Sequence, residues 1–279
     1  MGYISKIKNG TFLAAISLMA FASCKPSPVI STYFTSDDNG GYASDASKIE
    51  LVNEDAISIA DAAGTTYSNS YIAGCSSVST DTISVPHTLI IRFGDTNCPS
   101  LDGKQRRGAI IVSYSGRYTD SEQIHTITFD NYYINNNQLT GSIKVARVDT
   151  TVTGNWYYRV KVAETLNLNQ NTPSSQVINW DGALVRKWVS GYGTDTRADD
   201  IFSISGNANL VRNNGTNFQF GIATPLQVAL GCEYIESGVV DVTGPNGARI
   251  LDYGSGSCDA KAQVTLGQDN TVHPITLLP

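Results

Sequence analysis

Charged side chains are scarce in this sequence, and more of them are acidic than basic. Only 16% of its 279 residues are Asp, Glu, Lys or Arg, against roughly 25% in an ordinary soluble domain. With 19 basic and 25 acidic residues, the chain lacks the basic surface that nucleic-acid binding requires. Its low charge and its 14 tyrosines also exclude an intrinsically disordered chain.

Long apolar runs are missing as well. The run Thr11–Phe21 has 11 residues, whereas a membrane-spanning helix needs about 20. Lys6 and Lys8 precede it, which is the pattern of a secretory signal peptide. The run ends in Phe-Ala-Ser-Cys at 21–24, which resembles the lipobox of bacterial lipoproteins. We therefore expect residues 1–23 to be a signal peptide and Cys24 to be the acylated (palmitate-bearing) mature N-terminus; the alternative is an ordinary secreted protein.

The segment that follows Cys24 predicts a flexible tether. Residues 24–46 are rich in Pro, Ser, Gly and Asp, as linkers are, and we expect a single β-rich domain with pseudo-repeated halves over 47–279. Removal of 1–23 leaves 17 basic and 25 acidic residues, a formal charge of -8, so the lipid must hold the protein on a membrane. Lys25 resembles the residue found after the cysteine in outer-membrane lipoproteins; the direction in which the protein faces stays open.

Four further cysteines predict two disulfides. Cys75 and Cys98 are 23 positions apart, and Cys232 and Cys258 are 26 apart. Cys98 and Cys258 each end a similar motif, FGDTNC or YGSGSC. Among the three pairings that four cysteines allow, this duplication favours Cys75–Cys98 and Cys232–Cys258. A metal or redox site is disfavoured because no CxxC pair occurs and an oxidising compartment converts thiols to disulfides.

Most of the chain alternates apolar and polar residues, which is typical of antiparallel strands with one buried face. Turn sequences such as Asn214-Gly215 separate the strands. The segments 108–116 and 182–191 both begin with Gly-Ala and two apolar residues, which suggests a degenerate repeat of strand pairs. The alternating apolar positions are 127/129, 143/145, 158/160/162, 202/204, 218/220/222, 240/242, 264/266 and 275/277.

One segment has helical spacing instead. Apolar residues recur every three or four positions from Ile49 to Ala63, with serine caps at 44–47 and Gly64 at the end. The alternative is a short strand at 57–59. We predict an all-β fold of antiparallel hairpins or a meander, arranged as an elongated sheet or a two-sheet sandwich, with one N-terminal helix that covers one face.

Catalytic patterns are absent. His87, His125 and His273 lie far apart, and no GxSxG or HExxH motif occurs, so we interpret the histidines as surface or turn residues. The adjacent pair Asp199 and Asp200 would point to opposite faces of a strand. We therefore predict no catalytic residue, no metal and no cofactor.

Three other groups have both a binding and a structural interpretation. The loop with Asp95, Asn97 and Asp102 offers fewer oxygen ligands than calcium needs, so we assign it to turn chemistry. The basic run 104–107 is interpreted as a solvated loop rather than an anion site. The aromatic residues at 132–133, 156–158, 180 and 188 are either glycan-stacking platforms or core.

Several motifs resemble a group of uncharacterised, disulfide-containing β-rich lipoproteins of Bacteroidota-type bacteria. The resemblance rests on residues 93–98, 102–103, 106–108, 127–134, 141 and 252–259, spans 45–279, and implies a fold without an activity. We expect a lipid-anchored cell-envelope protein that acts as a non-enzymatic binding or scaffold module, with a glycan or an envelope protein as ligand. The alternatives are a polysaccharide hydrolase with Asp199, Asp200 or Glu233 as acids, and a structural subunit that polymerises by strand pairing.

Overall fold

The computed structural model describes residues 41–65, 75–100, 102–120, 123–148, 156–192, 194, 196–267 and 270–277. They form one helix and one antiparallel sheet in which each strand pairs with the next along the chain. The predicted meander with an N-terminal helix is confirmed, as one sheet rather than two. The elements are α1 (Gly41–Gly64), β1 (Ser77–Asp81), β2 (His87–Pro99), β3 (Gln105–Tyr114), β4 (Ile124–Ile134), β5 (Asn137–Val148), β6 (Tyr157–Leu168), β7 (Gln176–Ser190), β8 (Ile201–Arg212), β9 (Asn217–Ala229), β10 (Ser237–Gly244), β11 (Gly247–Ser255), β12 (Lys261–Leu266) and β13 (Val272–Thr276).

The alternating segments of the sequence all lie on strands, except that Leu277 follows the last residue of β13. The turns also lie where Asn and Gly predicted them. Asn135 and Asn136, between β4 and β5, have φ values of 48° and 64°, and Gly215, between β8 and β9, has 82°. Glycine and asparagine tolerate this left-handed backbone better than other residues. Local turn chemistry therefore sets the order of the strands.

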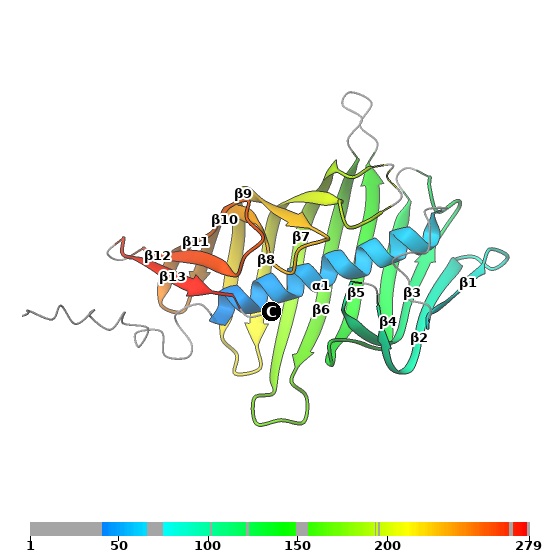
Figure 1. Cartoon of the computed structure of the whole chain (residues 1–279), viewed down its shortest axis with the longest axis horizontal. Helices are drawn as coiled ribbons and strands as arrows, with labels where there is room; N and C mark the ends of the chain where they lie inside the picture. The colour runs from blue at the N-terminus through cyan, green and yellow to red at the C-terminus, as the bar shows by residue number, and fades with distance from the viewer. Residues whose placement is uncertain are drawn as a thin grey trace, which may run out of the picture. The chain divides into compact units, whose positions relative to one another are not determined.

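The helix α1 lies across the strands of the sheet (Figure 1). It begins at Gly41, so residues 41–46, which the sequence assigned to the tether, are helical, and all but Gly41 are buried. The predicted contact of the helix with one face of the sheet is present, and 18 of its 24 residues are buried, which is more than the apolar residues at every third or fourth position. The reason is that side chains from β3 to β11 contact it, so the sheet curves around α1 and covers its polar side too.

Acidic residues of α1 meet basic residues of the sheet. Asp55 lies 2.6 Å from the guanidinium of Arg106 and 2.9 Å from Lys104, and Arg106 also binds Asp102. Burial alone would raise the pKa of Asp55, but the two cations outweigh it and lower that pKa. The interpretation of 104–107 as a solvated loop is therefore wrong for Arg106, which is fully buried, because the curvature of the sheet brings α1 onto it.

Two further ion pairs repeat this pattern along α1. Glu54 accepts a hydrogen bond of 2.6 Å from Arg186 on β7, and Asp45 lies 2.7 Å from Arg212 on β8. Removing one partner of a buried pair typically destabilises a protein by about 3–5 kcal/mol. These pairs hold α1 at one position along the sheet.

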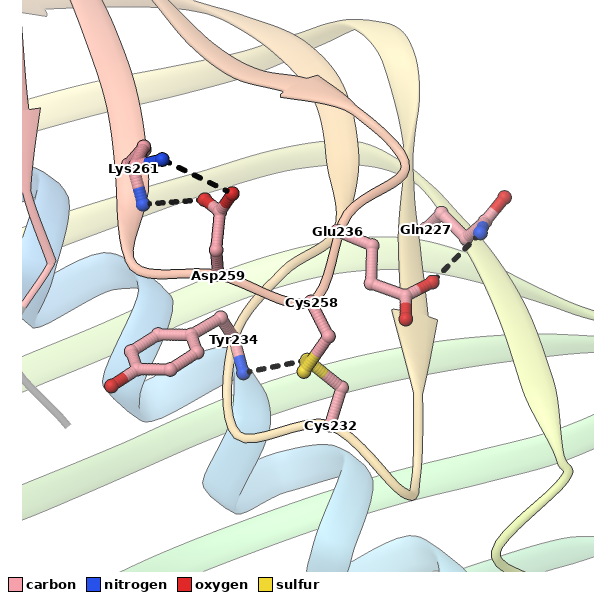
Figure 2. Close-up of a disulfide and its surroundings, with 7 residues drawn as sticks. All are labelled: Gln227, Cys232, Tyr234, Glu236, Cys258, Asp259 and Lys261. Carbon is pink, nitrogen blue, oxygen red and sulfur yellow. Dashed lines mark hydrogen bonds and ion pairs between the residues drawn. A yellow bond between two sulfur atoms is a disulfide. The ribbon is translucent and has the colours of Figure 1, made fainter.

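Both predicted disulfides are present. Their Cα–Cα distances are 5.9 Å for Cys75–Cys98 and 5.7 Å for Cys232–Cys258. Figure 2 shows the second one, which joins the connection after β9 to the connection after β11. Glu236 lies near both sulfur atoms, but neither sulfur is a thiolate that would bind a metal, and Glu236 accepts a hydrogen bond from Gln227.

The sheet has two edge strands, β1 and β13. Pro274 lies within β13 and has no N–H to donate to an added strand. No helix among the described residues combines the length and the apolar character that crossing a bilayer requires. The predicted signal peptide, Cys24 and most of the predicted tether lie outside the described residues, so these features stay predictions.

Candidate functional site

A cavity of about 330 Å³ lies at the C-terminal end of α1. The end of α1 forms one wall, and the sheet and its connections form the others. This volume is at the lower end of the range for small-molecule sites, about 300–1,000 Å³. The lining residues are Asp61, Gly64, Thr65, Tyr118, Thr119, His125, Val145, Arg147, Trp156, Tyr158, Trp188, Tyr192 and Arg197.

Aromatic rings form most of the walls. The rings of Tyr118 and His125 are stacked with centroids 4.1 Å apart. Tyr192 packs against Trp156 at 5.8 Å and against Trp188 at 5.2 Å. Flat apolar faces of this kind bind the faces of rings, because the negative face of an aromatic system attracts C–H groups.

The close approach of Tyr118 depends on a glycine at the end of α1. A Cβ atom on Gly64 would collide with the ring of Tyr118. The sequence predicted Gly64 as the residue that ends the helix, and the structure gives it this second role. The phenol of Tyr118 in turn donates a hydrogen bond of 3.5 Å to Asp61, which ties the β3–β4 connection to the helix.

Two ring nitrogens in the lining have no hydrogen-bond partner among the described residues, Nε2 of His125 and Nε1 of Trp156. Buried polar atoms in native proteins are nearly always paired, so each exception asks for a ligand or another explanation. The neighbouring indole of Trp188 shows the usual case, since its Nε1 donates to the carbonyl oxygen of Ser190 at 2.8 Å. Within the part of the chain that the structure describes, the cavity therefore offers two hydrogen-bonding positions that an occupant can use.

The imidazole of His125 is neutral at pH 7. Its side chain is 8% exposed, and burial lowers its pKa, an effect that Asp61 offsets only in part. The ring also makes a hydrogen bond to the backbone of Tyr118, which leaves Nε2 to meet a ligand. Burial, followed by the charge of Asp61, raises the pKa of Tyr118 well above its usual value, so its hydroxyl keeps its proton.

Two arginines in the lining lie over indole rings. The guanidinium carbon of Arg147 lies 4.2 Å from the centroid of Trp156, and that of Arg197 lies 5.0 Å from the centroid of Trp188. Arg197 also pairs with Asp200 at 3.1 Å. Contacts of this kind are cation–π interactions, in which the face of the ring attracts the positive charge.

The acids that the sequence offered for a hydrolase do not meet in this cavity. Of these acids, Asp199 and Glu233 are exposed, and Asp200 is buried. Burial raises the pKa of Asp200 to about 6, although Arg197 opposes this. Asp200 does not line the cavity, and Glu233 lines a different one of about 130 Å³. Among the described lining residues the one carboxylate is that of Asp61, whereas most glycosidases use two.

Sequence reasoning missed the central residue of this site. His125 was interpreted as a surface or turn histidine, which is wrong, because it is buried on β4. The sequence did contain a signal for this burial: His125 lies two positions before the apolar Ile127, so the two side chains share a strand face. The aromatic residues proved to be mixed, since Trp180 and Tyr132 are core, whereas Trp156, Tyr158 and Trp188 line the cavity.

The two segments that the sequence paired as a repeat form β3 and β7. Each is followed by a tyrosine, Tyr118 or Tyr192, and both tyrosines line the cavity. The two similar segments are therefore each followed by a tyrosine whose side chain lines the cavity.

A second hollow, of about 840 Å³, lies on the outer face of the sheet between β5 and β10. Lys144, Lys161, Asp181 and Asp241 are among its exposed lining residues, and its aromatic residue, Phe220, is buried. None of its described polar side chains is both buried and unpartnered. Among the described residues it therefore lacks the several aromatic rings and the buried, unpartnered ring nitrogens that line the cavity at α1.

Comparison of the chain with protein families, with curated proteins and with solved structures gave no match.

Proposed function

We propose that this protein is a non-enzymatic binding module, anchored to the cell envelope through a lipid on Cys24, and that it holds a sugar ring in the cavity at the end of α1. Two disulfides support a location outside the cytoplasm, because cytoplasmic thiols are kept reduced. The lipid anchor is inferred from the sequence motif at 21–24 and the outer membrane from Lys25, and the resemblance to Bacteroidota-type lipoproteins agrees with both.

The observation that carries the proposal is the combination of aromatic walls with Nε2 of His125 and Nε1 of Trp156, neither of which has a hydrogen-bond partner among the described residues. A sugar ring offers a surface for the aromatic walls and hydrogen-bond partners for the two nitrogens. Its C–H face packs on the aromatic rings, and its hydroxyl groups both donate and accept hydrogen bonds. A neutral imidazole nitrogen accepts from a hydroxyl, and the indole N–H donates to one.

The test is a binding measurement on the full chain, purified in detergent. Two of its three tryptophans, Trp156 and Trp188, line the cavity, so an occupant changes the intrinsic fluorescence. The probes are glucose, galactose, N-acetylglucosamine and galacturonate. Saturable binding by at least one of them is expected, together with a higher melting temperature, since a ligand of the native state stabilises it.

Matched variants locate the binding. Tyr192 is 54% exposed, so Tyr192→Ala leaves the core intact and removes a wall of the cavity. We expect affinity to fall by about 1 kcal/mol, roughly fivefold. Tyr157→Ala removes a tyrosine that does not line the cavity and is expected to leave affinity unchanged. Absence of binding by all four probes, or equal effects of the two variants, would contradict the proposal.

A further inference from the structure

The two edge strands, at opposite ends of the sheet (Figure 1), differ in what they allow. β13 contains Pro274, which cannot donate a backbone hydrogen bond to an added strand. β1 has the sequence Ser-Val-Ser-Thr-Asp, without the proline or lysine that commonly blocks an edge. β2 pairs with one side of β1, and no described residue forms a backbone hydrogen bond with the other side. Such an edge is a template for a further strand.

The hairpin of β1 and β2 also carries the most exposed aliphatic side chains of the described residues. Ile83 is 94% exposed and Val85 is 78% exposed, and both lie in the loop that follows β1. The loop has a defined conformation, because Oδ1 of Asp81 accepts hydrogen bonds from the backbone N–H groups of Ile83 at 2.8 Å and Ser84 at 3.1 Å. Apolar side chains that are held out toward solvent often mark an interaction site.

The sequence of β1 is compatible with a second copy of itself. When two β1 strands pair antiparallel about a twofold axis at Ser79, each Ser79 lies opposite the other. Val78 then lies opposite Thr80 of the second copy, on both sides of the axis. Both residues are β-branched, and cross-strand pairs of this kind stabilise a sheet.

The same pairing brings opposite charges together. Arg92 is exposed on β2 and lies in register with Ser77 on β1, and Ser77 lies opposite Asp81 of the second copy. The three residues form one row on the outer face, since residues opposite each other in a sheet share a face. Two strand spacings separate Arg92 from this Asp81, about 10 Å, which an arginine and an aspartate side chain span over the small serine. The twofold axis repeats this ion pair.

We infer that two copies of this chain associate through β1, antiparallel about a twofold axis at Ser79, so that the sheet continues from one copy into the other. A contact that uses the same surface of both copies closes after two. The edges that remain are both β13, with Pro274, so the assembly is a dimer and not the polymer that strand pairing could produce. One pair of five-residue strands is a small contact, so the dimer is weak and depends on concentration.

The test is disulfide formation in the full chain, purified in detergent. Paired residues of antiparallel strands have Cα atoms about 4.5–5.5 Å apart, within the range of about 4.4–6.8 Å for a disulfide. Ser79→Cys is therefore expected to form covalent dimers on oxidation. Ser77→Cys, at an exposed serine of the same strand, is the control, because the two Ser77 residues lie about 13 Å apart along the pair. The native chain, which keeps all other cysteines, is the reference.

These variants separate a specific pair from chance contact. Two chains that only share a micelle would form disulfides equally with either cysteine. Peptide mapping by mass spectrometry should find the link between the two introduced cysteines, with Cys75–Cys98 intact. Equal dimer formation by Ser77→Cys and Ser79→Cys, or none by Ser79→Cys, would overturn the inference.

A second measurement needs no new cysteine. Sedimentation of the native chain at rising concentration is expected to show a monomer–dimer equilibrium. Arg92→Glu should weaken association about tenfold, because both ion pairs become repulsive. Arg159→Glu, at an exposed position on β6, makes the same change of charge away from β1 and should have less than a twofold effect. A native chain that stays monomeric at its highest soluble concentration, or equal effects of the two charge reversals, would contradict pairing through β1.

Discussion

The carboxyl group of Glu50 gives the most quantitative test of how α1 is held. Glu50 lies on α1, 3% exposed, against apolar and aromatic side chains that include Trp180, Phe220 and Tyr253. Its Oε1 has no hydrogen-bond partner among the described residues. Burial, followed by the nearby charge of Glu54, raises the pKa of Glu50 to about 8. At pH 7 the side chain is therefore a neutral acid inside the protein.

This shift has a defined effect on stability. Between pH 4.5, the ordinary pKa of a glutamate, and pH 8, the folded protein keeps a proton that the unfolded chain releases. The free energy of unfolding therefore falls as the pH rises through this window. Each pH unit corresponds to about 1.4 kcal/mol, so the total loss of stability across the window is on the order of 5 kcal/mol. Below pH 4.5 the side chain is protonated in both the folded and the unfolded state, and nothing is lost.

The perturbation is Glu50→Gln, which keeps the shape of the side chain and cannot ionise. We expect the variant and the native protein to have similar free energies of unfolding by urea at pH 5, and the variant to be more stable by several kcal/mol at pH 8. Glu233→Gln, which replaces an exposed acid, is the control and should follow the native curve. If the free energies of unfolding of Glu50→Gln and the native protein change in parallel with pH, Glu50 does not hold a proton in the folded protein between pH 5 and pH 8.

Two further changes test the fold and the anchor. Gly108 has a φ of 83° and lies so close to the backbone of Asn131 that a Cβ would collide with it, so Gly108→Ala should cost roughly 3 kcal/mol in urea unfolding. The control is Gly215→Ala, at a φ of 82° with open space around it, which should cost about 1 kcal/mol. Equal losses of stability in the two variants would contradict the claim that Gly108 is required by its close contact with Asn131. Cys24→Ser should move the protein from the membrane to the soluble fraction of fractionated cells; retention of the variant in the membrane would contradict a lipid anchor.

Sequence patterns predicted the features that depend on local geometry. Strand alternation and turns such as Asn214-Gly215 placed the hairpins, because each depends on a few adjacent residues. The duplicated cysteine motifs gave the disulfide pairing, since each bond joins cysteines that are close along the chain: Cys75–Cys98 lies within the β1–β2 hairpin, and Cys232–Cys258 joins the connections after β9 and β11. In a meander, neighbours along the chain are also neighbours in space, which made the sheet easier to predict than a fold with long crossings.

The environment of α1 depends on the curvature of the sheet, which local patterns do not contain. The apolar spacing from Ile49 to Ala63 predicted the helix and its contact with one face of the sheet, but it gave no sign that the acids of α1 are buried as well. A signal did exist on the strands: Leu184, Arg186 and Trp188 alternate along β7 and share a face. An arginine between two core residues requires a buried partner, and Glu54 on α1 is that partner.

The cavity was missed for the same reason. Its residues come from the end of α1, from strands β4 to β7 and from the connections near them, and no local motif joins them. Trp156 and Trp188 were interpreted as glycan platforms or core; Trp188 belongs to the core, Trp156 packs against it, and both also line the cavity. His125 had no recognisable sequence frame, and the alternation that indicated its burial does not show which residues of other elements lie beside it.

The cavity at the end of α1 is proposed to hold a sugar ring, and the most direct measurement is a crystal structure of the protein with the probe sugar that binds most tightly. The ring is expected between the Tyr118–His125 stack and the Trp156–Tyr192 wall, with a hydroxyl group within hydrogen-bond distance of His125 Nε2. The sugar bound in the outer hollow between β5 and β10, with the cavity at α1 empty, would contradict the proposal.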